Sequence, residues 1–204
     1  MVFNPIESLN AAFVHRISEA YRSAYGNLGG REHEYGNIIR AAANLAIETI
    51  HRSDAFYHDV EHTMMVTLVG QEIFRGKLLS EGTVSPRDWA HFTIALLCHD
   101  IGYVRGICAG DDDRHAVIDV EGNRIEIPRG ATDAFLTPYH VERGKMFVRS
   151  RFGDHPQLDA ELIAHTIENT RFPVPEDSDA ADVVDWAQLV QAADLIGQMA
   201  DPDY

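Results

Sequence analysis

The sequence predicts an all-α protein, a helical bundle with one small β-hairpin inserted into it. Apolar residues at helical spacing mark the first helix, namely Ile6, Leu9, Phe13, Ile17 and Tyr21. Asn4-Pro5 and Ser85-Pro86 each place a capping side chain before a proline, a pattern typical of helix starts. Residues 110–130 depart from this pattern, because they contain two short β-like runs around a turn, 117–120 and 124–127.

The expected helices follow one another along the whole chain. The first runs from Pro5 to a break at 26–30, and three more are expected over 35–51, 56–74 and 86–100. Three further helices are expected to begin at 137, at 156, and at 178 or 179. An extended linker is expected over 172–175. The 204 residues suffice for one sizeable core and are short for two, so we expect a single domain over residues 1–204.

Composition and charge exclude several classes of function. The chain is 45% hydrophobic and 24% charged, which is typical of a soluble globular protein. Its net charge of -15 argues against binding to nucleic acid or to anionic membranes. No apolar run approaches the ~20 residues of a membrane span. The two cysteines form no disulfide framework and favour a cytoplasmic location.

The two ends of the sequence give further expectations. The first residues have neither a basic region nor an apolar segment, so we expect no signal peptide. The sequence stops at Asp201-Pro202-Asp203-Tyr204, soon after a segment with a candidate ligand, and we expect a further C-terminal element beyond it.

One apolar stretch, Ala95-Leu96-Leu97-Cys98, runs directly into the pair His99-Asp100. A buried carboxylate without a partner is costly or becomes neutral. A divalent metal ion removes this cost, because imidazole nitrogen and carboxylate oxygen are both good ligands.

Further histidines and an aspartate fit the same interpretation. His58 and His62 are four residues apart in the predicted third helix, which would place both on one face. His140 lies in the first turn of a predicted helix, and His165 and Asp194 each lie among the apolar residues of a later predicted helix. Each of them alone is as readily explained as a surface or core residue. A single metal centre inside the bundle would account for all of them together.

The order of these residues resembles that of the HD-domain metal-dependent phosphohydrolases. The tract Tyr57-His58-Asp59-Val60-Glu61-His62-Thr63-Met64-Met65-Val66 is similar to the Tyr-His-Asn-x-x-His-Ala-x-x-Val motif of the cyclic-nucleotide phosphodiesterases in that superfamily. The resemblance spans about residues 57–194 and implies an all-α HD-domain helical bundle. Two positions depart from the motifs. Asp59 replaces the usual Asn, and Tyr103 stands where phosphodiesterases carry a further His and HD-GYP proteins a Lys.

The resemblance also implies roles for individual residues. It implies first-metal ligands at His62, His99, Asp100 and Asp194, with Asp100 bridging to a second metal. It implies second-metal ligands at His140 and His165. His58 matches the histidine that protonates the leaving oxygen. The expected cofactor is one or two divalent ions, of Mn, Fe, Ni, Co, Zn or Mg.

The expected reaction is hydrolysis of a small-molecule phosphate ester, a phosphodiester or a nucleotide, by metal-activated hydroxide with His58 as general acid. Lys145 and Arg171 are candidates for binding the substrate, although surface salt bridges are the commoner explanation for each of them alone. The hairpin at 110–130 either covers the site or forms a contact in a homo-oligomer.

Two other functions are compatible with the same pattern. One is a di-iron oxygenase on an HD-type scaffold, which would need a redox-active iron pair and dioxygen. The other is a non-catalytic sensor domain that keeps the metal or only the fold. The complete set of ligand residues and the retained His58 argue against the sensor domain. We favour the hydrolase over the oxygenase, although the order of the ligands is compatible with both.

Overall fold

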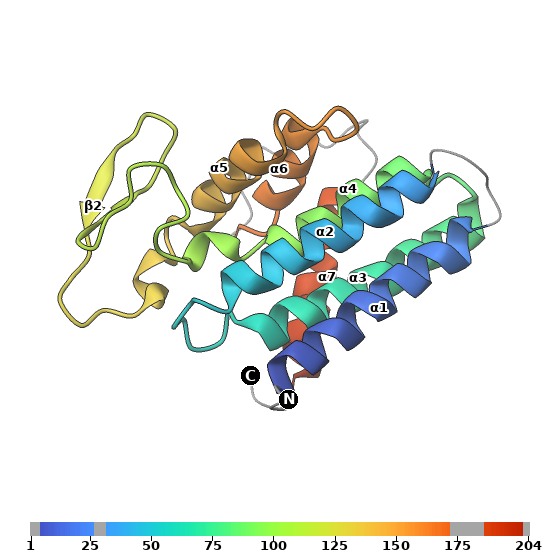
Figure 1. Cartoon of the computed structure of the whole chain (residues 1–204), viewed down its shortest axis with the longest axis horizontal. Helices are drawn as coiled ribbons and strands as arrows, with labels where there is room; N and C mark the ends of the chain where they lie inside the picture. Colours follow the sequence, from blue (N-terminus) through green and yellow to red (C-terminus); the bar gives the residue numbers. More distant parts are fainter. Residues whose placement is uncertain (1–4, 27–31, 172–185, 202–204) are drawn as a thin grey trace.

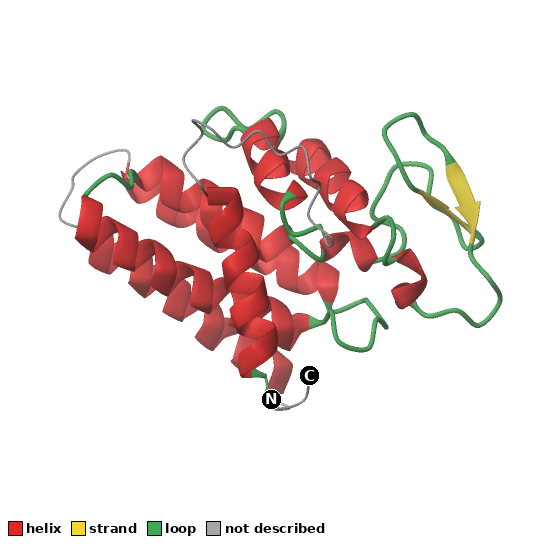
Figure 2. Ribbon diagram, turned by 180° about the vertical axis from the view of Figure 1, so that it is seen from behind, coloured by secondary structure: helices red, strands yellow, loops and turns green. Residues whose placement is uncertain are grey.

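The computed structural model describes residues 5–26, 32–171 and 186–201. The described chain is mostly helical and carries one two-stranded antiparallel sheet, which confirms the predicted all-α class with a small hairpin (Figures 1 and 2). The helices are α1 (Pro5–Tyr25), α2 (Glu32–Ile50), α3 (Val60–Glu81), α4 (Pro86–Cys98), α5 (His140–Phe152), α6 (Ala160–Glu168) and α7 (Trp186–Ala200). Two 3-10 turns, η1 (Ile101–Tyr103) and η2 (Asp133–Leu136), and two strands, β1 (His115–Val117) and β2 (Arg124–Glu126), complete the described elements.

Helix α4 is the centre of the core. Every residue from Trp89 to Cys98 is buried, and the helix packs against α2, α3, α6 and α7. The helix starts where it was predicted, at Ser85-Pro86, and a capping box is present there: the Ser85 hydroxyl accepts from the Asp88 N–H and the Asp88 carboxylate accepts from the Ser85 N–H. As a result, the residues that follow the helix, His99 and Asp100, are delivered into the middle of the protein.

Helix α7 lies closely against α3. A Cβ atom on Gly197 would come within 2.9 Å of Val66 Cγ2, so the absence of a side chain allows the close contact between the two helices. Val190 and Ala193 are fully buried in the same contact. This packing places Asp194, the next residue, towards α3.

The structure corrects two predicted helix starts. The third helix begins at Val60 rather than at 56, because the Asp59 side chain caps it by accepting from the N–H groups of Glu61 and His62. His58 therefore lies before the helix, and the prediction that His58 and His62 share a helical face is wrong. The sixth helix begins at Ala160 rather than at 156, where Asp159 caps the Leu162 N–H.

The hairpin is present but its first strand lies earlier than predicted. Strand β1 ends at Val117, which pairs with Arg124, so the predicted strand over 117–120 is wrong. The Asp119 carboxylate accepts from the backbone and side-chain N–H groups of Asn123, and this interaction turns the chain. The predicted linker over 172–175 and the predicted start of the last helix at 178 or 179 lie outside the described residues.

A buried arginine attaches the hairpin segment to the bundle. Arg143 of α5 is 0% exposed, and its guanidinium donates five hydrogen bonds. They go to the backbone oxygens of Gly102 (2.8 Å), Val104 (2.8 Å) and Val117 (2.5 Å), and to both oxygens of Asp111 (3.0 and 3.1 Å). All five N–H groups of the side chain are therefore used. We call Arg143 and Asp111 the arginine hub.

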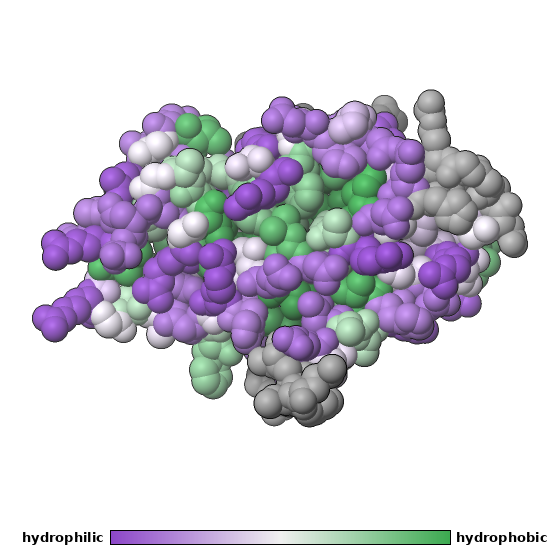
Figure 3. Space-filling model, viewed as in Figure 1, coloured by the Kyte–Doolittle hydropathy of each residue, from purple (hydrophilic) through white to green (hydrophobic). Residues whose placement is uncertain are grey.

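Hydrophilic residues cover most of the face shown in Figure 3, with apolar side chains between them. Among the described helices, none combines the length and the apolar character that a membrane crossing requires.

Candidate metal centre

Four ligand-type side chains from three helices meet in the interior. His62 comes from the first turn of α3, His99 and Asp100 follow α4, and Asp194 lies on α7. The two Nε2 atoms of His62 and His99 are 3.3 Å apart, and Asp100 Oδ2 is 3.2 and 3.1 Å from them. Asp194 Oδ1 is 3.3 Å from His62 Nε2 and 3.8 Å from His99 Nε2. We call these four residues the histidine–aspartate cluster.

The cluster is almost completely enclosed. The side chains of His62 and His99 are 1% and 0% exposed, and those of Asp100 and Asp194 are 5% and 13% exposed. No lysine or arginine forms an ion pair with either carboxylate among the described residues. The two buried carboxylates therefore face imidazoles and, at Asp194, the neutral amide of Gln198 (3.1 Å), an arrangement that favours binding of a cation.

Hydrogen bonds fix which ring nitrogens face the cluster. His99 Nδ1 lies 2.7 Å from the Leu96 carbonyl oxygen, which can only accept. The proton of a neutral His99 therefore sits on Nδ1, and the lone pair of Nε2 points into the cluster. His62 Nδ1 is buried and has no hydrogen-bond partner among the residues that the structure describes. The facing Nε2 atoms of His62 and His99 would repel each other unless a proton or a metal ion lies between them.

The spacing of the four atoms fits a common ion. Nitrogen and oxygen ligands bind first-row divalent metals at about 2.0–2.2 Å, so ligand atoms of one ion lie roughly 3–3.6 Å apart. The distances of 3.1–3.3 Å within the cluster fall in this range, and the 3.8 Å between His99 Nε2 and Asp194 Oδ1 is slightly longer. The residues present therefore fit a divalent metal held by the two imidazole nitrogens together with carboxylate oxygen.

The electrostatics of the metal-free cluster agree with this interpretation. Burial lowers the pKa of His62, but hydrogen bonds and charges from Asp100 and Asp194 outweigh burial and raise that pKa to about 9. The pKa of His99 is also raised, because the charge of Asp100 overcomes its burial. Burial alone would raise the pKa of Asp100, yet His99 and His58 hold it well below its usual range. Protons on the imidazoles thus supply the positive charge that a metal ion would otherwise supply.

His58 lies beside the cluster rather than within α3. Its Nδ1 donates to Asp100 Oδ2 at 2.7 Å, and its side chain is 29% exposed. The segment that carries it is anchored by reciprocal hydrogen bonds, from the Asp54 N–H to Asp133 Oδ2 (3.3 Å) and from the Asp133 N–H to Asp54 Oδ1 (2.6 Å). Arg105 forms ion pairs with both aspartates. His58, His62 and Asp100 also form a second group that could hold a metal ion.

His140 approaches the other oxygen of Asp100. Its Nδ1 lies 2.6 Å from the Thr137 carbonyl oxygen, which leaves Nε2 directed at Asp100 Oδ1, 3.8 Å away. Burial lowers the pKa of His140. The contact depends on Gly102, because a Cβ atom there would lie 1.8 Å from the His140 carbonyl oxygen. The sequence did not predict that Gly102 allows the His140 backbone to approach, although a glycine two residues after Asp100 was a signal of a close backbone contact.

Three other predicted site residues are not brought to the cluster. His165 is exposed on α6, and within the described chain no hydrogen bond or ion pair joins its imidazole to the cluster. Lys145 donates to Glu142 (2.7 Å) and Glu168 (2.6 Å), and Arg171 pairs with the same two glutamates. Lys145 and Arg171 thus belong to an ion-pair network that includes residues of both α5 and α6.

The chain belongs to the Npun_R2479-like family. The model of that family matches residues 3–204, so the match includes the hairpin and all members of the cluster. No curated protein and no solved structure matches the chain.

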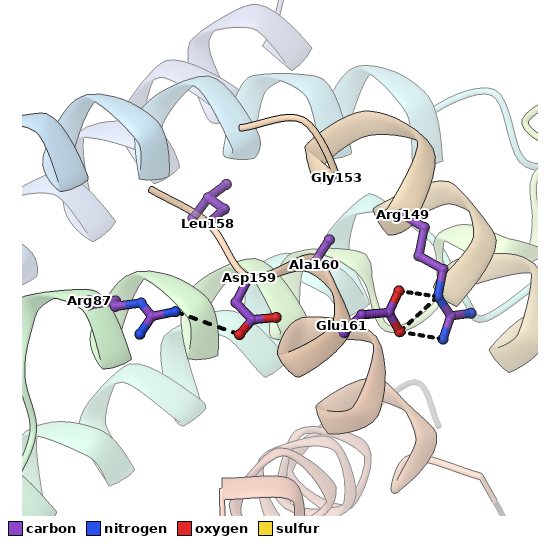
Figure 4. A pocket seen from close by; sticks show the side chains of 7 residues that line it. All are labelled: Arg87, Arg149, Gly153, Leu158, Asp159, Ala160 and Glu161. Carbon is purple, nitrogen blue, oxygen red and sulfur yellow. Dashed lines mark hydrogen bonds and ion pairs between the residues drawn. The ribbon is translucent and has the colours of Figure 1, made fainter. Parts of the chain in front are cut away.

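A hollow outside the histidine–aspartate cluster has no comparable set of unpaired charged side chains among the residues that line it. It has a volume of about 340 Å³ and is lined by residues of α4, α5 and α6 and of the segment before α6. Figure 4 shows its two arginines, each already paired with an acid: Arg87 with Asp159 at 3.6 Å, and Arg149 with Glu161 at 2.9 Å. Because these charges are matched within the protein, the hollow offers no unpaired group to a ligand.

Proposed function

We propose that this protein is a metal-dependent phosphohydrolase of the HD-domain type, acting on a small-molecule phosphate ester such as a phosphodiester or a nucleotide. The observation that carries the proposal is a buried site in which the His62 and His99 nitrogens lie 3.3 Å apart and 3.1–3.8 Å from the oxygens of Asp100 and Asp194. These residues occur along the chain in the order that resembles the HD-domain enzymes. The proposed cofactor is a divalent ion of the Mn, Fe, Ni, Co, Zn or Mg type.

The cluster would hold the ion, and its own chemistry prepares it to do so. A divalent ion bound there would offset the negative charge of a phosphate ester and lower the pKa of a bound water. The hydrogen bond from His99 Nδ1 to the Leu96 oxygen orients the imidazole, as outer hydrogen bonds do for metal-binding histidines. Asp100 and Asp194 provide the negative charge that selects a cation.

His58 is suited to the role of general acid. Its Nδ1 is held by Asp100, which fixes the ring. Its other nitrogen, Nε2, makes no hydrogen bond within the described chain, and the side chain is 29% exposed. A substrate in the site could therefore receive a proton from Nε2 on its leaving oxygen, while Asp100 stabilises the charged ring.

A cytoplasmic location is part of the proposal. Cys98 and Cys108 are both free and buried, which suits a reducing compartment.

Metal-dependent hydrolysis tests the proposal. The protein is stripped with a chelator, each metal is restored singly, and hydrolysis of an aryl phosphodiester and an aryl phosphomonoester is measured. We expect activity to return with at least one metal and to be lost in Asp100→Asn, while Asp113→Asn, an exposed control, keeps it. His58→Gln should bind metal normally and lose turnover, since it removes only the proton donor.

Other results would favour another function. Bound metal without hydrolysis of either ester would contradict the hydrolase and point to a sensor. Consumption of dioxygen by the iron form would point to the oxygenase.

A further inference from the structure

We propose that Gln198 is a positioning residue of the metal centre. Its side-chain amide holds the Asp194 carboxylate so that Oδ1 faces the two imidazoles, and this raises the affinity of the centre for its ion. The inference rests on the proposed function and concerns a residue outside the four ligands, to which the resemblance gives no role. It does not depend on the number of ions, because Asp194 belongs to only one of the two groups that could hold a metal.

One oxygen of Asp194 is shared between the amide and the cluster. Gln198 Nε2 donates to Asp194 Oδ1 at 3.1 Å. The same oxygen lies 3.3 Å from His62 Nε2 and 3.8 Å from His99 Nε2. An ionised carboxylate can only accept hydrogen bonds, so the nitrogen of the Gln198 amide, and not its oxygen, must face it. The amide therefore fixes the oxygen that would bind the ion.

Asp194 is the ligand that most needs this support. The side chains of the other three ligands are at most 5% exposed, whereas that of Asp194 is 13% exposed. Fixing a side chain costs conformational entropy, and a carboxylate at the edge of the cluster is free to turn towards solvent. A hydrogen bond that already holds the carboxylate in place reduces this cost when the ion binds.

The packing of α7 places the two side chains beside each other. The buried residues of α7 include Ala193 and Gly197, and Gly197 lies directly against α3. Asp194 and Gln198 each follow one of these two residues and are four apart, so they are neighbours on the flank of the buried face. Since His62 belongs to α3, the close contact between the two helices fixes the amide relative to His62 as well as to Asp194.

The neutral charge of the donor also fits the role. A lysine at position 198 would neutralise Asp194 and compete with a cation for it, because opposite charges attract. An amide orients the carboxylate and leaves its negative charge available to the ion. Carboxylates that bind metals are themselves commonly hydrogen-bonded, and loss of such a partner typically weakens metal affinity or activity by about 10–100-fold.

Metal affinity tests the proposal without reference to activity. Gln198→Met keeps the length of the side chain and removes the donor, and Gln188→Met makes the same change at an exposed position of α7. Each metal-free protein is titrated with Mn²⁺ by calorimetry. We expect the dissociation constant to rise about 10-fold in Gln198→Met and to stay within about twofold in Gln188→Met.

The outcomes separate this inference from the proposed function. An unchanged dissociation constant in Gln198→Met would overturn the role of Gln198 and leave the metal centre intact. If the unaltered protein binds neither Mn²⁺ nor any of the other metals, the metal centre itself is wrong.

A double-mutant cycle tests whether Gln198 acts through Asp194. Asp194→Ala should weaken Mn²⁺ binding by itself. Adding Gln198→Met to this variant should then weaken binding by less than about twofold, because the carboxylate that the amide holds is gone. The same loss in both backgrounds would mean that Gln198 acts by another route, and would overturn the inference.

Gln198→Lys distinguishes positioning of the carboxylate from simple support of the helix. Its ammonium group would pair with Asp194, so we expect the melting temperature of the metal-free protein not to fall, while Mn²⁺ affinity falls at least as far as in Gln198→Met. A pair that only stabilises α7 would keep both. This variant also decides the question if Gln198→Met does not fold, as judged by circular dichroism, since unchanged affinity in Gln198→Lys would overturn the inference.

Discussion

Two buried polar clusters meet at the turn η1, and they differ in how completely their groups are paired. In the arginine hub, each guanidinium N–H has an acceptor, and Asp111 also accepts from the N–H groups of Gly106, Cys108 and Val117. In the histidine–aspartate cluster, two carboxylates face two imidazoles without a lysine or arginine partner in the described chain, and one buried ring nitrogen lacks a partner.

The difference separates a structural cluster from a binding site. Burying charged groups is favourable only when their charges and hydrogen bonds are compensated. The hub achieves this compensation within the protein, so its effect is to attach the hairpin segment to α5. The histidine–aspartate cluster leaves compensation to protons or to a bound cation. Incomplete pairing, rather than burial of polar groups as such, therefore identifies the candidate site.

The largest expected effect comes from breaking the hub. Arg143→Met would leave Asp111 buried without its partner and three backbone oxygens without a donor. We expect the free energy of unfolding to fall by about 3–5 kcal/mol in urea titrations. Arg149→Met removes an exposed pair with Glu161 and should cost no more than about 1 kcal/mol. Equal effects of the two substitutions would contradict the structural role of the hub.

Metal binding at the histidine–aspartate cluster should stabilise the folded protein. With Mn²⁺ at about 100 times its dissociation constant, we expect the free energy of unfolding to rise by about 2.7 kcal/mol. Asp100→Asn should abolish this increase, and Asp113→Asn, which changes an exposed acid, should retain it. Thermal or urea unfolding with and without chelator measures the difference. An increase that persists in Asp100→Asn would show that the ion binds elsewhere.

The two clusters should respond to pH in opposite directions in the metal-free protein. The pKa of His62 is raised from 6.5 to about 9, so its contribution to stability is complete below pH 6.5 and is lost as the pH rises through about 9. Burial opposes ionisation of Asp111, but hydrogen bonds from Arg143 outweigh it and lower the pKa below 3.8. The contribution of Asp111 is therefore present above pH 3.8 and is lost as the pH falls through its lowered pKa.

Urea titrations across this pH range check the prediction. The alkaline loss should be on the order of 1–2 kcal/mol, since one pKa unit corresponds to about 1.4 kcal/mol and His62 shares its interactions with a coupled partner. His62→Gln should remove the alkaline loss, whereas His165→Gln, at an exposed position, should preserve it. An alkaline slope that is the same in His62→Gln would disprove the assignment.

The smallest effect is expected for the network of α5 and α6. Lys145→Met removes the ion pairs with Glu142 and Glu168 and should change the free energy of unfolding by no more than about 1 kcal/mol. Because both pairs satisfy the ammonium group, we expect the KM for the aryl phosphodiester to stay within about threefold. A much larger KM would restore Lys145 as a substrate-binding residue.

Local signals in the sequence predicted the helices well. The Ser85-Pro86 start of α4 was predicted correctly because the capping box involves residues only three apart. The same kind of signal was misread at Asp59, which caps α3 and so excludes His58 from the helix. In both cases the deciding interactions lie within a few residues, and a better interpretation of the caps would have been enough.

Long-range contacts decided what sequence patterns could not. His140 and His165 looked equivalent as candidate ligands, yet His140 faces Asp100 and His165 is exposed. The face that α6 turns inward depends on its packing against α4 and α5. In the same way, the sequence offers no sign that Arg143 is fully buried, since its partners are spread over residues 102–117.

The sequence by itself determined the all-α class, the hairpin insertion and the residue types of the centre, because periodicity, caps and the His-Asp pair are local properties. Only the tertiary structure decided that Asp194 lies 3.3 Å from His62, that His165 is exposed away from the cluster, and that Lys145 is paired with glutamates. The physical reason is that compensation of a buried charge depends on which groups the fold brings within a few ångströms, and the order of residues does not contain those distances.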